Sequence, residues 1–217
     1  MLALFLNCRK EFFFNLLLFN FTIKNIKMDF SELVAKCRSY RRFDESVRIE
    51  YDFLKRLIGY VRLSPSASNK QPLKFLLYNS PSDCDKIFPC TNWAGYLSDW
   101  HGPEPGERPT AYIIILGDTK ISDSFGIDPG IAAQSIKLGA TEAGFGGCMI
   151  ASIEKKQLRS ELQIPEQYEI LLIIALGKPV EKVVVEDIIN NDVKYWRDEN
   201  KVHHVPKRTI DELILKL

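Results

Sequence analysis

The chain has 217 residues, 46% of them hydrophobic, and a formal net charge of +1. This length and apolar content are sufficient for one domain with a substantial core. Acidic and basic residues nearly balance, which argues against a dedicated nucleic-acid-binding protein, because such proteins carry a basic face or a high isoelectric point. Five scattered cysteines without C-x-x-C spacing, and only three histidines, predict no metal site and no disulfide framework. A reducing cytoplasm is the expected location.

Residues 1–27 differ in composition from the rest of the chain. They are rich in Phe, Leu, Asn and Lys, and charged residues at positions 9–11 interrupt them, so no apolar run reaches the roughly 20 residues of a spanning helix. The segment also lacks the basic start and small-residue cleavage site of a signal peptide. We expect an extension outside the fold, with Met28 as the biological start, residues 28–217 as a single domain and no stable membrane association. A membrane-associating N-terminal segment is the alternative.

The first expected helix, 30–37, is followed directly by a basic stretch. Asp29 is suited to cap the helix, with Glu32 three residues further on. The basic stretch contains Arg38, Ser39, Arg41 and Arg42. One interpretation is a solvated helix end, because the helix dipole favours cations there. The other is a phosphate site, because arginines separated by a small hydroxyl residue can converge as forked donors on one dianion.

A second expected helix, 50–62, leads into a polar loop bounded by Pro65 and Pro72. The loop is an ordinary connector in one interpretation. In the other, its serine, asparagine and glutamine side chains face a polar ligand. Pro72 favours an extended conformation for Gln71, and a strand is expected to follow over 73–78.

The remaining elements are predicted from apolar periodicity and turn residues. In chain order we expect a helix over 80–88, a strand over 110–116, a helix over 130–143 capped by Asp128, a strand over 148–152, a helix over 154–162 and a strand over 168–176. Residues 91–103 combine two tryptophans with a Gly/Pro-rich loop, which suits a lid, a ligand wall or a dimer contact. The polar tail, 180–217, is expected to lie over another surface.

Several common motifs are absent. No G-x-G-x-x-G follows a strand, no G-x-x-x-x-G-K-[ST] is present, and the histidines and aspartates show no metal-ligand spacing. No Ser/His/Asp set can be assembled either. The sequence therefore does not support a dinucleotide-binding Rossmann site, a P-loop or a hydrolytic triad.

Two signatures resemble those of the nitroreductase superfamily. The first is Arg38-Ser39-x-Arg41-x-Phe43, and the second is Ser64-Pro65-Ser66-x-x-Asn69-x-Gln71-Pro72. A small-residue helix ending at Gly146-Gly147, the Gly177-x-Pro179 segment and a late basic pair match later landmarks of the superfamily. The resemblance covers residues 29–217 and implies an α+β fold, with a mostly antiparallel central sheet flanked by helices. It also implies an intertwined homodimer with FMN at the subunit interface.

The resemblance also assigns cofactor-binding residues. Arg38, Ser39 and Arg41 would bind the FMN phosphate or ribityl chain, and Lys207, with Arg208, would close the phosphate site. The flavin would be lined by Pro65, Ser66, Asn69 and Gln71 from the partner subunit, and approached through backbone groups by Ile150, Ala151 and Ser152. Cys37 departs from the pattern, because many members carry a further arginine there. Either one phosphate donor is missing, or Arg42 replaces it.

The activity that the resemblance implies is an NAD(P)H-dependent flavin oxidoreductase. A hydride from NAD(P)H would reach flavin N5, and a small-molecule acceptor such as a nitroaromatic or quinone would then be reduced in a ping-pong cycle. No side-chain nucleophile is expected, because the flavin carries the chemistry. Two alternatives stay open: other flavin chemistry of the same superfamily, such as reductive dehalogenation or flavin fragmentation, and a non-catalytic flavin-binding module.

Overall fold

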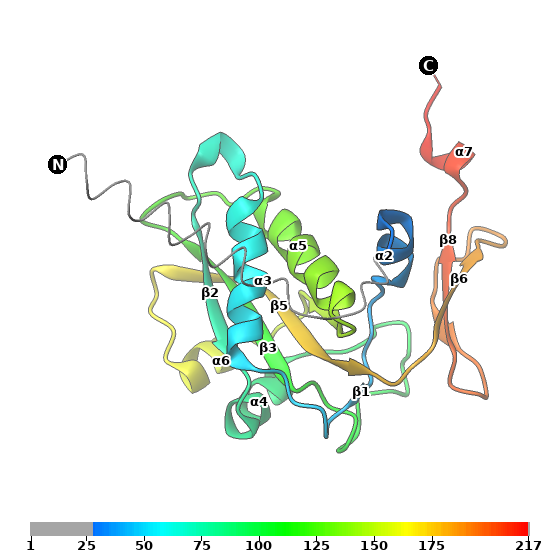
Figure 1. Ribbon diagram of the computed structural model, residues 1–217, viewed down its shortest axis with the longest axis horizontal. Helices are drawn as coiled ribbons and strands as arrows, with labels where there is room; N and C mark the ends of the chain where they lie inside the picture. Colours follow the sequence, from blue (N-terminus) through cyan, green and yellow to red (C-terminus); the bar gives the residue numbers. More distant parts are fainter. Residues whose placement is uncertain (1–27, 217) are drawn as a thin grey trace.

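The computed structural model describes residues 28–216, so the predictions made for residues 1–27 lie outside the described residues. A five-stranded antiparallel sheet forms the centre of the molecule (Figure 1). Its strands are β1 (Phe43–Asp44), β2 (Leu73–Tyr78), β3 (Ala111–Asp118), β4 (Gly146–Ile150) and β5 (Tyr168–Pro179). Strand β5 pairs with β3 along one edge and with β4 and β1 along the other, while β2 pairs with β3. The predicted mostly antiparallel sheet is confirmed.

Helices cover both faces of this sheet, because the side chains of β3 alternate between them. Ile113 and Ile115 pack with α3 (Tyr51–Leu63) and α5 (Asp128–Glu142). Tyr112 and Ile114 belong to a second cluster with α4 (Pro81–Ile87) and α6 (Lys155–Leu162) on the opposite face. Short 3-10 turns lie at η1 (Ala67–Asn69) and η2 (Phe88–Cys90). The fold is therefore α+β with helices on either side, as predicted.

Helix α2 (Phe30–Lys36) begins as the sequence predicts. The Glu32 N–H donates to Asp29 Oδ1 at 2.9 Å, which caps the helix. The helix buries none of its own residues, however, and Phe30 is 73% exposed. The apolar stripe of α2 therefore lies on the surface of the single chain.

The C-terminal region forms a small sheet of its own, which we call the C-terminal unit. It contains β6 (Val183–Asp187), β7 (Trp196–Arg197) and β8 (His203–Lys207), followed by α7 (Ile210–Leu213). Strand β8 is central, parallel to β6 and antiparallel to β7. Figure 1 shows this unit beside α2, away from the central sheet. Its strands have two to five residues, too few to show a clear period of two, so the sequence did not predict them.

Among residues 28–216, none of the helices is long and apolar enough to pass through a membrane.

Candidate functional site

The segment after α2 lies against the beginning of β4. Ser39 forms a parallel bridge with Gly147, and the Tyr40 N–H donates to the Gly147 carbonyl at 3.2 Å. A Cβ at Gly146 would lie 2.5 Å from the Tyr40 ring. Glycine at this position thus permits the close approach that places Ser39 beside β4.

The other end of β4 leads to the predicted backbone donors. Ile150 is buried, whereas Ala151 and Ser152 are exposed. The Ser152 carbonyl accepts from the Asn92 N–H at 3.0 Å, while the N–H groups of Ala151 and Ser152 donate to no other group in the described chain. About 13 Å of extended strand separates Gly147 from Ala151. One strand therefore connects the start of the arginine segment to open backbone donors.

Arg38 and Arg41 differ in their partners. Arg38 Nη2 donates to the Val34 carbonyl at 3.2 Å and its Nε to the Cys37 carbonyl at 3.1 Å, so in this structure Arg38 stabilises the C-terminus of α2. Arg41 Nη1 donates to the Ser39 carbonyl at 3.3 Å and lies 3.2 Å from His203 Nε2. Its guanidinium also lies over the Tyr195 ring, 4.9 Å from the centroid.

Arg42 forms a bidentate ion pair with Glu107. Its Nε and Nη2 donate to the two carboxylate oxygens at 2.6 and 2.5 Å, and its side chain is only 12% exposed. The hydrogen bond to Glu107 raises the pKa of Arg42, and the same bond lowers the pKa of Glu107. Arg42 is thus held by a carboxylate, which speaks against the hypothesis that it replaces the donor missing at Cys37.

A buried carboxylate that the sequence did not indicate joins the arginine segment to the C-terminal unit. The side chain of Glu181 has no exposed area. It accepts from the Arg41 backbone N–H and, at 3.2 Å, from Arg197 Nη2. The Arg197 guanidinium in turn lies over the Trp100 ring, 4.3 Å from its centroid. Glu181 therefore fixes the backbone of Arg41.

His203 is the second unpredicted residue beside Arg41. It is 1% exposed, and burial lowers the pKa of its imidazole to about 4, with the positive charges of Arg41 and Arg197 acting in the same direction. Because a guanidinium can only donate, Nε2 accepts and the proton lies on Nδ1. Among the described residues Nδ1 has no hydrogen-bond partner.

The loop between α3 and β2 is held by another buried carboxylate, that of Asp128. Ser66 Oγ donates to Asp128 Oδ2 at 2.6 Å, and the Ala67 N–H donates to Oδ1 at 3.0 Å. Asp128 is 4% exposed and is the first residue of α5. The predicted N-cap role of Asp128 was therefore wrong: Ile127 occupies the cap position, and the carboxylate binds the loop instead.

Three residues of this loop have left-handed backbone conformations. They are Ser68, Asn69 and Gln71, with φ angles of 51°, 52° and 52°. The extended conformation predicted for Gln71 was wrong, because its N–H turns to donate to Ser66 Oγ at 3.0 Å. Each such residue costs on the order of 1–3 kcal/mol, and such strain concentrates at functional sites. Pro65, Ser66, Gln71 and Asp128 also line a pocket of about 210 Å³.

The predicted cofactor residues form two groups that do not meet within one chain. Ser66 lies at the N-terminus of α5, whereas Ser39 lies beside Gly147, just beyond the C-terminus of the same helix. With 15 residues, α5 is about 22 Å long. Pro65, Asn69 and Gln71 are exposed beside Ser66. The two groups therefore lie near opposite ends of α5.

Lys207 and Arg208 also lie apart from the arginine segment. Both are exposed at the end of β8. Arg208 Nη1 donates to Asn191 Oδ1 at 3.2 Å and approaches Glu212 at 3.4 Å. Within residues 28–216, neither residue forms a hydrogen bond or ion pair with Arg38, Ser39 or Arg41. Their role in closing a phosphate site stays a prediction.

The aromatic segment borders the same region. Trp93 is 8% exposed and packs in the core cluster of α4 and α6, although the sequence suggested that its segment forms a lid, a ligand wall or a dimer contact. Its ring meets Trp100 edge-on, with 6.5 Å between centroids, and Tyr96 packs on Tyr195 of the C-terminal unit at 4.9 Å. The segment thus connects the end of β4 to the C-terminal unit.

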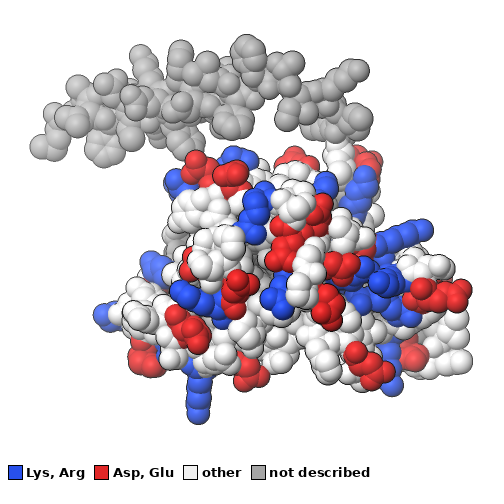
Figure 2. Space-filling model, turned by 90° about the horizontal axis from the view of Figure 1, so that it is seen from below, with Lys and Arg blue, Asp and Glu red and all other residues white. Residues whose placement is uncertain are grey.

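The described surface carries mixed charge and offers no metal site. Figure 2 shows acidic and basic side chains interspersed, with basic ones densest toward the C-terminal unit. Among the described residues, no group of three or more His, Cys, Asp or Glu side chains could hold a metal ion. The four described cysteines, 37, 84, 90 and 148, are buried and unpaired with one another.

Comparisons with known proteins agree on one class. The fold is that of nitroreductases: the crystal structure of a nitroreductase family protein from Clostridium novyi NT matches with a TM-score of 0.58 and 26% identity, over 70% of this chain and 87% of that one. A proposed nitroreductase from Exiguobacterium sibiricum 255-15, solved in complex with FMN, matches with a TM-score of 0.63 and 21% identity, over 78% and 97%.

Sequence comparison gives the same result. A model described as the nitroreductase family matches residues 104–178. YdgI of Bacillus subtilis (strain 168), a proposed NAD(P)H nitroreductase, is 22% identical over 188 residues, covering 71% of this chain and 90% of that protein. All these comparisons indicate the nitroreductase superfamily, which confirms the resemblance found in the sequence motifs.

Proposed function

We propose that the protein is a homodimeric, FMN-dependent oxidoreductase that uses NAD(P)H to reduce a small electrophilic acceptor. The observation that carries this proposal is the course of β4. The strand begins beside the arginine segment and ends at the exposed N–H groups of Ala151 and Ser152. Cationic side chains at one end suit a phosphate, and free backbone donors at the other suit the polar edge of a flavin.

The residues present fit the cofactor. Arg41 is directed by Glu181 and His203, so within residues 28–216 its guanidinium is placed without being paired to a carboxylate. Ser39, two residues before Arg41, forms a bridge with Gly147 of β4. When bound, FMN would supply hydride transfer between a nicotinamide donor and an acceptor. The side chains of this chain would bind and orient the cofactor and restrict access of water, and none would act as a nucleophile.

The second group of predicted residues supports a dimer. Pro65, Ser66, Asn69 and Gln71 would line the flavin bound mainly by the partner chain, since α5 separates them from the arginine segment of their own chain. Apolar residues of α2 and α7 are also exposed in the single chain: Phe30 at 73%, Ile210 at 75% and Leu213 at 70%. Exposed apolar surface of this kind favours association.

The proposal is tested with purified full-length protein. We expect it to be yellow, to sediment as a dimer and to oxidise NAD(P)H when a quinone or nitroaromatic is added. Arg41→Ala should weaken FMN binding about 10- to 100-fold, because a forked donor to a phosphate contributes roughly 1.5–3 kcal/mol. Arg42→Ala is the matched control, because Arg42 is bound to Glu107, and it should retain FMN.

Three results would contradict parts of this proposal. Colourless protein that does not bind added FMN would refute the cofactor. Protein that binds FMN but never oxidises NAD(P)H would be a flavin-binding module. Equal loss of FMN in Arg41→Ala and Arg42→Ala would show that the phosphate assignment of Arg41 is wrong.

A further inference from the structure

A buried lysine lies beneath the arginine segment. Lys137 is located on α5 between small and aliphatic residues and is only 6% exposed. In the described part of the chain, its ammonium group makes neither a hydrogen bond nor an ion pair. Even partial burial of an ammonium group that has no carboxylate partner is unfavourable. Its presence on a helix that otherwise packs with alanines and glycine therefore needs a reason.

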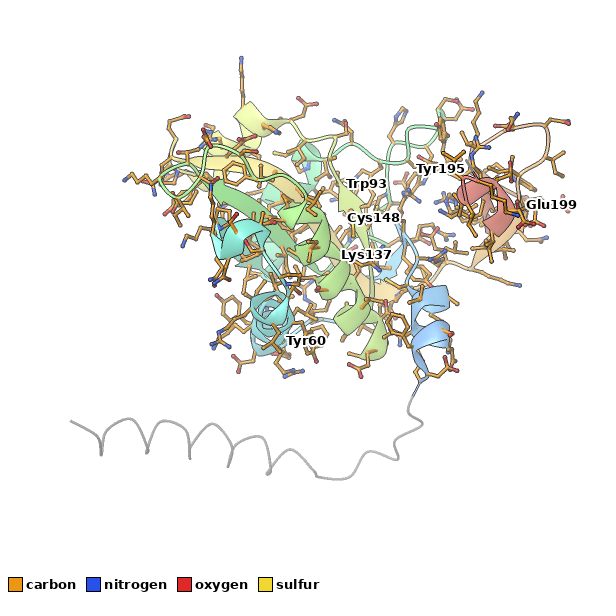
Figure 3. The ribbon with its side chains drawn as sticks, turned by 90° about the horizontal axis from the view of Figure 1, so that it is seen from above. Tyr60, Trp93, Lys137, Cys148, Tyr195 and Glu199 are labelled. Carbon is orange, nitrogen blue, oxygen red and sulfur yellow. The ribbon has the colours of Figure 1, made fainter. Side chains whose placement is uncertain are left out.

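The charged groups that shift the pKa of Lys137 belong to the candidate phosphate site. Burial lowers the pKa of Lys137; the thiols of Cys37 and Cys148 oppose this effect, while Arg38 and Arg41 add to it. Gln134, one turn earlier on α5, reaches Cys37 Sγ at 4.0 Å. Figure 3 shows Lys137 and Cys148 together on the side of α5 toward the C-terminal unit.

Positive charge exceeds negative charge at this place. The charges of Arg38 and Arg41 lower the pKa of Lys137, and the buried carboxylate of Glu181 is already shared by the Arg41 backbone and the Arg197 guanidinium. Like charges in a partly buried environment repel strongly, because the effective dielectric constant is low. A dianion placed among these groups would relieve this repulsion.

The sequence also lacks one expected phosphate donor, at the position of Cys37. Cys37 occupies a position where many nitroreductases carry a further arginine, and Arg42 is bound to Glu107 at 2.5 and 2.6 Å. Gln134, one turn before Lys137 on α5, reaches Cys37 Sγ at 4.0 Å, so this part of α5 lies against the position of the missing group. Helix α5 could therefore provide what the segment after α2 lacks.

We propose that Lys137 is a third cationic residue of the phosphate-binding site, in place of the donor absent at Cys37. The inference rests on the proposed function, since FMN is the phosphate-bearing ligand. It assigns a binding role to a residue outside both sequence signatures. Lys137 would strengthen the binding of the FMN phosphate and would not change the binding of the flavin ring.

The test separates the phosphate from the rest of the cofactor. FMN and riboflavin, which lacks the phosphate, are titrated into wild-type apoprotein and Lys137→Met, a variant that keeps the unbranched side chain. We expect FMN affinity to fall about 10- to 100-fold and riboflavin affinity to stay unchanged. Lys36→Met is the control, because Lys36 is exposed and paired with Glu32 at 2.6 Å. It should bind both ligands as wild type does.

The second measurement is thermal stability, which should rise in the variant without ligand although its FMN affinity falls. Without ligand, the melting temperature of Lys137→Met should exceed that of wild type, because an uncompensated buried charge is removed. The rise in melting temperature caused by FMN should be smaller in the variant. Lys137→Leu should behave in the same way and serves if the methionine variant does not fold.

The outcomes distinguish this inference from the proposed function. If wild type binds FMN and the Lys137 variants bind it equally well, Lys137 is not part of the phosphate site. Equal losses of FMN and riboflavin would show that Lys137 only supports packing and would also overturn the inference. If wild-type protein binds neither ligand, the proposed function fails, and this inference fails with it.

Discussion

Protonation of His203 should make the stability of the protein depend on pH below neutrality. The imidazole is 1% exposed, and its pKa is lowered from 6.5 to about 4 in the folded chain. Well above pH 6.5 the residue is neutral in both states and contributes no pH dependence. As the pH falls from 6.5 toward 4, the unfolded chain binds a proton that the folded chain does not bind, so the free energy of unfolding decreases.

The size of this effect follows from the shift in pKa. One pKa unit corresponds to about 1.4 kcal/mol, so the full shift amounts to about 3 kcal/mol, of which about 2 kcal/mol is lost by about pH 5. Two other described histidines, His101 and His204, are present in every variant compared. Their contribution cancels when the variant differs from wild type at His203 alone.

The assay is urea unfolding of wild type and His203→Gln at several pH values between about 7.5 and 5. Glutamine offers an oxygen that can accept from Arg41 as Nε2 does, but it does not titrate. We expect the loss of stability on acidification to be smaller in the variant by about 2 kcal/mol. Parallel pH profiles for the two proteins would refute the reasoning.

Three further predictions concern the loop and the two ends of the chain. Asp128→Ala should lower the free energy of unfolding by about 2–4 kcal/mol, because Ser66 Oγ and the Ala67 N–H lose a charged acceptor; urea unfolding measures this, and a loss no larger than that of Asp128→Asn would contradict it. A chain beginning at Met28 should match the full chain in melting temperature and flavin content, and aggregation of the shorter chain would show that residues 1–27 belong to the fold. Deletion after Asn190 should weaken the dimer and flavin binding together, so a monomer that keeps stoichiometric flavin in sedimentation and absorbance measurements would disprove this prediction.

Local patterns were sufficient to predict most of the central fold. Capping residues and apolar periods placed α2, α3 and α4 to within one or two residues, and α5, predicted to end at residue 143, ends at Glu142 shortly before Gly144, whose φ is 77°. The uninterrupted apolar run at 111–116 is a buried strand. These elements are set by contacts between near neighbours in the sequence, which a pattern can reveal.

Long-range partners were not predictable in the same way. The role of Glu181 depends on Arg41, 140 positions earlier, and that of Asp128 on Ser66, 62 positions earlier. Neither carboxylate has a local signature. Lys137 did leave a signal, because a charged residue interrupts the small and apolar sequence of α5, and such an exception in a packed helix deserves a separate hypothesis.

The attachment of the C-terminal unit has a consequence for the rate and affinity of ligand binding. The unit is attached to the rest of the chain through three side chains. Tyr195 and His203 contact the Arg41 guanidinium. Arg197 contacts the Trp100 ring and the buried carboxylate of Glu181. A local opening of this unit would release the arginine and the aromatic segment in the same event. If Arg41 must leave His203 to hold an anion, the observed affinity is the intrinsic affinity scaled by the fraction of open molecules. Substitutions in the contacts that hold the unit closed, such as Tyr195→Ala, would then tighten binding by raising that fraction.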